Sequence, residues 1–188
     1  LHKEFIKILS STKLEKENNN QNIVYSIIKK LYEIGEIEKA YKLVKKIPEN
    51  TITDQSKLSY FYFIELNYLY SSRLLSEACD LKTALIEKGI SLPEFLLEKS
   101  DIFCLTLENK YSEANLLNSL LLETEKKLDE NFQKLFKFIF LKEKNDDFFG
   151  SLSEVKSRQL IFLYSAMLRI NELPLDNDFI EVDPLNLS

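Results

Sequence analysis

Histidine and cysteine, the residues most often used for nucleophilic and metal chemistry, are scarce in this sequence. His2 is the only histidine, and it lies at the start of the chain. A Ser-His-Asp triad or a Cys-His pair needs a well-placed histidine, so neither arrangement is available. Two cysteines, 25 positions apart, do not form a zinc motif without further Cys or His ligands. We therefore predict no catalytic nucleophile and no metal site.

Carboxylates are the only remaining candidates for acid–base chemistry. Glu94, Glu98 and Asp101 recur at helical spacing and share part of one face. General acid–base catalysis needs a pocket that shifts the pKa of such groups, and the sequence indicates none. The polar stretch 145–150 lacks the alternating ligands of a calcium loop. The glycines are too scattered for a phosphate-binding loop. The sequence predicts no enzyme and no cofactor.

Cys79 and Cys104 are too few to form a disulfide framework. Cysteine without a partner is among the residues most often buried in protein cores. The sequence therefore favours two buried thiols, with a single bridge between them as the alternative.

The composition is typical of a folded helical chain. Of its 188 residues, 45% are hydrophobic and 12% aromatic, which excludes a disordered chain. Three glycines and four prolines are too few for the turns of a β-sandwich or barrel. The formal net charge of −5 offers no basic surplus for nucleic acid. No apolar run approaches the roughly 18 to 20 residues that span a bilayer.

The chain begins at Leu1 rather than Met, which leaves open that it is a fragment or a processed protein. The lack of a signal peptide therefore does not decide the compartment, and a cytoplasmic location is only the default expectation. The oligomeric state is open as well.

Three segments of the chain align without gaps. They are residues 35–40 (GEIEKA), 73–78 (RLLSEA) and 109–114 (NKYSEA), at spacings of 38 and 36 residues. Each begins with a turn residue, has a large apolar residue two positions later and ends on Ala. The aligned columns continue on both sides, through Leu43, Leu81 and Leu117 downstream and Ile28, Leu66 and Ile102 upstream.

These spacings predict two antiparallel helices per copy. Steps of three and four residues place the apolar positions on one helical face. The Ala is small because two helices cross closely there, at about 8–10 Å between their axes. Such hairpins must stack on one another to bury both apolar faces. Pro48 and Gly89 stand where second helices should end, and residues 91–94 (SLPE) are typical of a capping box.

Residues 31–48 carry a Leu, a Gly, an aliphatic residue, an Ala and a Pro in the order of a tetratricopeptide repeat, which they resemble. The resemblance covers about residues 20–127 and implies an all-α fold, a right-handed α-solenoid of antiparallel helical hairpins. The pitch exceeds the family's 34 residues, and large residues such as Ile28 replace small ones in the first helices. Both departures predict a looser superhelix. The part from Ile102 onward is similar to uncharacterised helical-repeat proteins of alphaproteobacteria, which implies no activity.

We expect four parts in the chain. An N-terminal helix occupies residues 1–18, and three tetratricopeptide-like hairpins occupy 19–127. A variant terminal unit follows at 128–171, with a first helix at about 129–144 and a second at about 153–171. An extended tail occupies 172–188.

In tetratricopeptide-like stacks, ligands lie on the concave face made by the first helices. Carrying the family's groove positions onto this sequence implies a partner-binding groove of tyrosine, asparagine and lysine side chains. Its residues are Asn22, Tyr25, Lys29 and Tyr32 in the first copy, Tyr60, Asn67 and Tyr70 in the second, and Lys99 in the third. This mixture suits recognition of a peptide. Phe63 and Phe103 fall at such positions too, but packing between repeats is their favoured role.

The resemblance implies a non-catalytic scaffold that binds a peptide or protein surface. Because fold does not fix function, two alternatives stay open. Residues 75–93 also resemble a pentatricopeptide unit, which binds RNA at about one base per helical pair, although the acidic charge argues against nucleic acid. The other alternative is a superhelical accessory domain of a larger enzyme.

Overall fold

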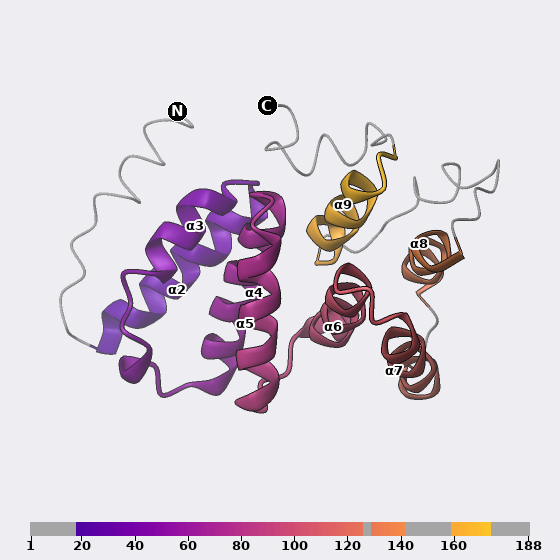
Figure 1. Cartoon of the computed structure of the whole chain (residues 1–188). Coiled ribbons are helices and arrows are strands. Elements are labelled where there is room, and N and C mark those ends of the chain that lie inside the picture. The colour runs from indigo at the N-terminus through magenta and orange to yellow at the C-terminus, as the bar shows by residue number, and fades with distance from the viewer. Residues whose placement is uncertain (1–17, 126–128, 142–158, 174–188) are drawn as a thin grey trace. The chain divides into compact units, whose positions relative to one another are not determined.

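The structure is a computed structural model that describes residues 18–125, 129–141 and 159–173 (Figure 1). All regular elements in these residues are helical: eight α-helices and two short 3-10 helices, with no β-strand among them. The all-α class predicted from the sequence is therefore confirmed. By its contacts the chain divides into two compact units, Leu1–Tyr68 and Leu69–Ser188, which are described separately.

The first unit contains α2 (Asn18–Glu33), α3 (Ile37–Val44), the 3-10 turn η1 (Glu49–Thr51) and most of α4 (Gln55–Ser71). Helices α2 and α3 pack on each other as a hairpin. Ile28 and Leu31 on α2 and Ile37 on α3 are buried, as their spacing predicts. Each large aliphatic side chain buried in this way stabilises the fold by about 1.5–3 kcal/mol.

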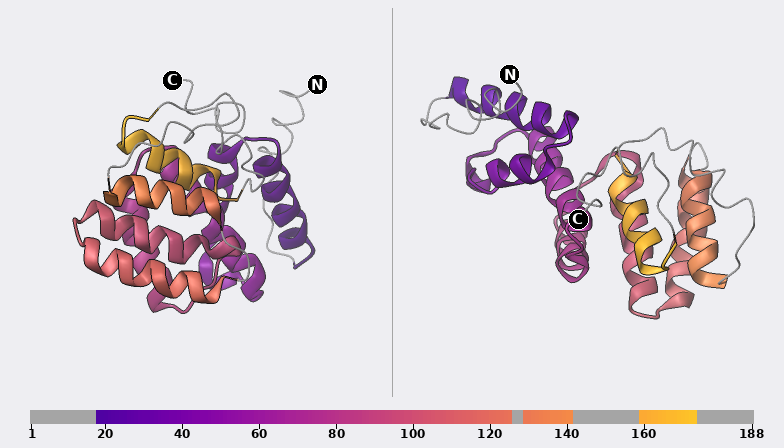
Figure 2. Two further views of the ribbon diagram at one scale, coloured as in Figure 1. Left: turned by 90° about the vertical axis from the view of Figure 1, so that its right-hand side faces the viewer. Right: turned by 90° about the horizontal axis from the view of Figure 1, so that it is seen from above.

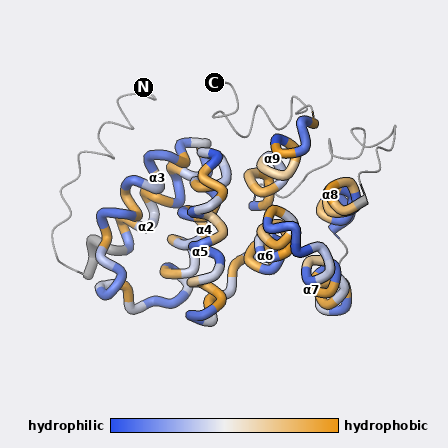
Figure 3. Tube along the Cα trace, in the orientation of Figure 1, coloured by the Kyte–Doolittle hydropathy of each residue, from blue (hydrophilic) through white to orange (hydrophobic). Residues whose placement is uncertain are grey.

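The second unit contains the remaining helices. They are α5 (Leu75–Glu87), η2 (Pro93–Phe95), α6 (Leu96–Leu107), α7 (Tyr111–Thr124), α8 (Glu130–Leu141) and α9 (Ile161–Ile170). Helix α6 is central, because α5, α7 and α8 all pack against it, and α9 packs on α8. Figure 2 shows α6, α7, α8 and α9 running roughly along one direction. Figure 3 shows α9 as largely hydrophobic, and every residue from 161 to 168 is buried.

The turn that joins the two helices of each copy has the same backbone conformation all three times. Gly35, Arg73 and Asn109 have positive φ angles of 84°, 62° and 59°. In each case the turn residue donates its N–H to the carbonyl three positions earlier, and the next N–H reaches five positions back, at 2.8 to 3.2 Å. This closure satisfies the last carbonyls of the first helix and needs a left-handed residue. The structure thus confirms the turn column of the alignment.

The Ala column is confirmed as well. Ala40, Ala78 and Ala114 each have 0% of their surface exposed. A larger side chain at these positions would have to displace the facing helix, which explains why the column is small.

The predicted end of α5 and the predicted start of the next helix had different outcomes. Gly89 has φ of 64° and closes α5 with the same pair of hydrogen bonds, so the predicted cap is confirmed. The capping box predicted at residues 91–94 is wrong. Pro93 begins the separate 3-10 turn η2, and α6 starts only at Leu96, without a side-chain cap. Glu94 and Phe95 both have φ of 54°, a left-handed kink that local sequence signals did not indicate.

The terminal unit is described in part. Asp129 accepts a hydrogen bond from the Phe132 N–H at 3.0 Å and so caps α8. The second helix, expected at about 153–171, is described as α9 (Ile161–Ile170). Residues 142–158, which include the polar stretch 145–150, lie outside the described residues. So do residues 1–17, with His2 and most of the expected N-terminal helix, and nearly all of the expected tail, 174–188.

Cys79 on α5 and Cys104 on α6 form a disulfide, with 5.8 Å between their Cα atoms. The favoured prediction of two thiols is therefore wrong, and the alternative holds. The bridge joins the second helix of one copy to the first helix of the next. Their approach depends on how neighbouring copies pack, which the spacing of two cysteines in the sequence does not reveal.

Candidate functional site

Three of the predicted groove residues, Tyr25, Tyr32 and Tyr60, come together in the first unit. Tyr25 on α2 lies edge-to-face with Tyr60 on α4, with 5.4 Å between ring centroids. Tyr60 stacks on Phe63 at 5.7 Å, and Tyr32 meets Phe63 edge-on at 5.2 Å. Tyr25, Tyr60, Phe63 and Tyr32 therefore form one continuous series of rings, the aromatic row. Its three tyrosines are half-buried, whereas Phe63 is buried beneath them.

Polar groups border the aromatic row at the start of α2. Lys57 donates a hydrogen bond from Nζ to Asn22 Oδ1, and its ammonium lies 5.9 Å from the centroid of the Tyr25 ring. A cation over a tyrosine face contributes about 0.5–1 kcal/mol at an exposed site. Lys29 is exposed on the same helix. Lys57 was missed from the sequence, although it stands three positions before Tyr60 and so on the same face of α4.

Tyr60 remains a neutral hydrogen-bonding group at ordinary pH. Burial raises the pKa of its hydroxyl well above the usual value of 10.0, and the nearby Tyr25 and Glu33 add to this rise. Half-exposed tyrosines of this kind combine a large apolar ring with a polar tip. The aromatic row can therefore make apolar contacts and hydrogen bonds to the same partner.

The other three predicted groove residues are buried. Asn67 is fully buried and donates from Nδ2 to the Phe63 carbonyl at 3.0 Å, one turn earlier in α4. Tyr70 is also fully buried, with its ring centroid 6.1 Å from that of Phe103. Lys99 is 1% exposed. As placed here, none of the three can touch a partner, so the open part of the predicted groove is the aromatic row and its border.

Lys99 belongs instead to a buried ionic network in the second unit. Its ammonium lies 2.9 Å from Glu125 Oε1 and 2.7 Å from Asp129 Oδ2, and donates to the Glu94 carbonyl at 3.1 Å. Tyr164 on α9 donates its hydroxyl hydrogen to the same Asp129 oxygen. The network thus ties α6 to the end of α7, the start of α8, and α9.

The network holds its groups in fixed charge states. Burial alone would raise the pKa of Asp129, but the hydrogen bonds from Lys99 and Tyr164 and the Lys99 charge outweigh it, so that the pKa is lowered. Burial, reinforced by Asp129, raises the pKa of Tyr164 far above its usual value. At neutral pH the carboxylate stays ionised and the phenol stays neutral. The network is therefore suited to holding helices together rather than to moving protons.

An apolar cleft of about 570 Å³ lies in the second unit between α5, α6 and α7. Ile86 and Leu120 line it and are 46% and 49% exposed. Glu98 and Asp101 also line the cleft. Exposed apolar surface bordered by charge is typical of protein-interaction sites.

Within the described residues, no group of three His, Cys, Asp or Glu side chains is arranged to hold a metal ion. The helices described here also include none that is both long enough and apolar enough to cross a bilayer.

Comparison with known proteins adds no further assignment. No protein-family model matches the chain, no curated protein matches it, and no solved structure matches it. The likeness to tetratricopeptide repeats therefore rests on the residues and turns described above.

Proposed function

We propose that this protein is a non-catalytic scaffold, a right-handed tetratricopeptide-like solenoid, and that it binds a partner protein or peptide through the aromatic row. The observation that carries the proposal is the aromatic row itself. Three half-exposed tyrosines lie within one series of ring contacts, with Asn22 and Lys57 as polar neighbours. Tyrosines are enriched among the residues that dominate binding energy at protein interfaces, and truncating such a residue costs at least about 2 kcal/mol.

The solenoid part of the proposal is supported by the repeated turn. A common left-handed residue, a common pair of hydrogen bonds and a buried Ala recur at Gly35, Arg73 and Asn109. Copies that share a turn and a packing column present similar faces to their neighbours, which is the condition for regular stacking.

The test compares matched variants in affinity capture from the native lysate, with captured molecules identified by mass spectrometry. The double variant Tyr25→Ser, Tyr32→Ser removes two rings of the aromatic row. The control, Ile23→Ser, removes a 54% exposed apolar residue from the same helix but outside the aromatic row. We expect a protein that is retained by the wild type and by Ile23→Ser, and lost with the double variant.

Circular dichroism must show that the double variant keeps its helicity. A protein captured equally by all three forms would contradict a role for the aromatic row. Recovery of RNA in place of a protein would instead support the pentatricopeptide-like alternative.

A further inference from the structure

The apolar cleft of the second unit has a buried floor and an exposed rim. Helices α5 and α7 both pack against α6, and all three helices contribute lining residues. Leu97 and Ile102 on α6 and Leu121 on α7 are buried and form the floor. Ile86 on α5 and Leu120 on α7 are exposed and form the rim. The cleft therefore offers apolar surface at two depths.

Contacts between α5 and α6 fix two sides of the cleft. The disulfide between Cys79 and Cys104 joins the two helices. Lys82 Nζ also lies 2.7 Å from Asp101 Oδ1 across the same interface. A surface that is held in one conformation before binding loses less conformational entropy when a partner binds. The cleft is therefore pre-formed, as binding sites usually are.

One carboxylate at the cleft has no counter-charge. Of the two acidic residues that line it, Asp101 is neutralised by Lys82. Glu98 is exposed, and no described residue forms an ion pair or hydrogen bond with its carboxylate. Glu98 stands in the first turn of α6, where the helix dipole favours a negative charge. No basic side chain is found among the described residues that line the cleft, so the cleft carries a net negative charge.

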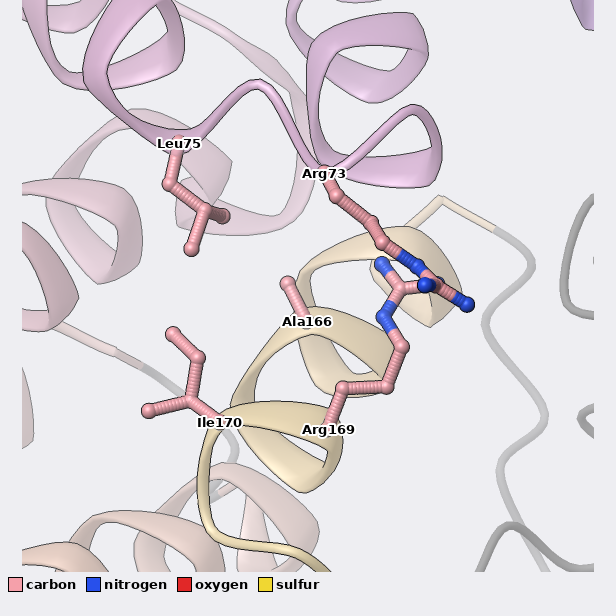
Figure 4. Close-up of a pocket in the computed structure, with 5 residues that line it drawn as sticks. All are labelled: Arg73, Leu75, Ala166, Arg169 and Ile170. Atoms are coloured by element: carbon pink, nitrogen blue, oxygen red, sulfur yellow. The ribbon is translucent and has the colours of Figure 1, made fainter.

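A second pocket of this unit differs, because one of its charged groups is used by the fold. Its volume is about 410 Å³, and its lining residues are Arg73, Leu75, Ala166, Arg169 and Ile170 (Figure 4). Arg169 donates from Nη2 to the Tyr70 carbonyl at 2.6 Å, near the end of α4, where the helix dipole favours a positive charge. The Glu98 carboxylate at the cleft, by contrast, is open to a partner.

We propose that the cleft binds an amphipathic α-helix of a partner protein. The aliphatic face of that helix packs on the floor and rim, and a Lys or Arg beside this face pairs with Glu98. Amphipathic helices bind apolar grooves through side chains spaced three and four residues apart. A helix fits this surface better than a small ligand does, because exposed apolar surface continues along α7 to Leu116. This residue lies one turn before Leu120 and is 62% exposed.

A second copy of this chain fits the cleft less well. In a symmetric dimer both copies use the same surface. The two Glu98 carboxylates would then approach one another, and like charges brought together in an interface oppose binding. The proposal does not rest on the aromatic row, which lies in the other unit.

The experiment is fluorescence anisotropy of the full chain with two labelled synthetic peptides of 14 residues, the length of α7. Both are alanine-based helices with leucines spaced three and four residues apart. One carries lysines beside the leucines, and the other carries glutamates there. We expect the lysine peptide to bind about tenfold more tightly, because it pairs with Glu98 whereas the glutamate peptide is repelled. Glu98→Gln should remove most of this difference.

Two leucine variants of α7 test the location of the site. Leu120→Ser should weaken binding of the lysine peptide about three- to tenfold, because about half of the burial free energy of a leucine is lost. Leu122→Ser is the matched control. It removes a 43% exposed leucine from the same helix, but one that stands two positions from Leu120 and so faces away from the cleft. It should leave the affinity unchanged.

The proposal is overturned if the lysine peptide does not bind, if the glutamate peptide binds equally well, or if both leucine variants weaken binding alike. A dimer in sedimentation velocity that is dissociated by Leu120→Ser but not by Leu122→Ser would instead assign the cleft to a second copy. The double variant Tyr25→Ser, Tyr32→Ser should bind the lysine peptide as the wild type does. Loss of binding in this variant would assign the peptide to the aromatic row and overturn the proposal.

Discussion

Replacing Lys99 with Met tests whether the buried ionic network is needed for the second unit to fold. Met keeps an unbranched apolar side chain but removes the ammonium, which lies 2.9 Å from Glu125 Oε1 and 2.7 Å from Asp129 Oδ2. Removing one partner of a buried ion pair costs about 3–5 kcal/mol, because the other charge is left uncompensated. Two carboxylates lose their partner here. We therefore expect the free energy of unfolding to fall by at least about 3 kcal/mol near pH 7.

The penalty should depend on pH in a direction set by Asp129. In the wild type its folded pKa lies below the ordinary value of 3.8, so its stabilising contribution is present above the unfolded pKa and is lost as the pH falls through the folded pKa. Without Lys99, its hydrogen bond and its charge no longer lower the folded pKa of Asp129 while burial still raises it, so this pKa should rise. Asp129 then costs the variant less stability than the wild type as the pH falls from 7 toward 4. The gap between them should shrink.

The assay is urea unfolding followed by far-ultraviolet circular dichroism, near pH 7 and near pH 4. Lys46→Met, at an exposed lysine, is the control and should change the free energy of unfolding by no more than about 0.5 kcal/mol. The triple variant Lys99→Met, Glu125→Gln, Asp129→Asn removes all three charges and should recover most of the loss, since neutral replacements of a whole buried ion pair are often tolerated. A loss below about 1 kcal/mol near pH 7, or an equal loss at both pH values, would refute the reasoning.

Four further variants test the repeat and its bridge. The double variant Cys79→Ala, Cys104→Ala opens a loop of 25 residues and should lower the free energy of unfolding by about 3 kcal/mol. A reductant titration of the wild type should show the same loss, and equal stability of the oxidised and reduced protein would contradict this prediction. Ala78→Leu overpacks a fully buried crossing and should cost about 1–3 kcal/mol in urea unfolding; a change of only a few tenths of a kcal/mol would show the Ala column to be misplaced. Gly35→Ala places a Cβ in a positive-φ turn and should lower the free energy of unfolding by about 1 kcal/mol. Asn109→Gly should leave it unchanged or raise it by a few tenths of a kcal/mol in thermal melts. Destabilisation by Asn109→Gly but not by Gly35→Ala would disprove the common turn.

Local signals sufficed for the features that lie within one hairpin. The turn residue and the Ala of each copy could be aligned because their roles are set by neighbours a few positions away. The positive φ of Gly35 was readable in this way, and alignment alone extended the same conformation to Arg73. Glu94 and Phe95 had no such column to support them, and their left-handed kink was missed.

Contacts between neighbouring copies could not be read from the sequence. The bridge from Cys79 to Cys104 requires the distance between α5 and α6, which depends on the stacking geometry rather than on residue type. Likewise, no local rule places Arg169 of α9 beside the Tyr70 carbonyl, to which its Nη2 donates at 2.6 Å. Asn118 and Gln133 show the same limit: their two reciprocal amide hydrogen bonds, at 2.9 and 2.8 Å, join α7 to α8.

The exposure of the predicted groove positions differs from copy to copy, and in the third copy the terminal helix α9 gives a reason. In the alignment, Tyr25 of the first copy corresponds to Phe63 of the second and Lys99 of the third. The first is half-exposed, whereas the second and third are 2% and 1% exposed. In the second unit α9 reaches the third-copy position through Tyr164 and the Asp129 carboxylate that Lys99 also binds. Since residues 161–168 of α9 are all buried, this apolar helix is surrounded by other elements, and in the second unit it helps to close off the third-copy position. Of the three aligned positions, only that of the first copy stays half-exposed, which is why the proposed partner site is the aromatic row.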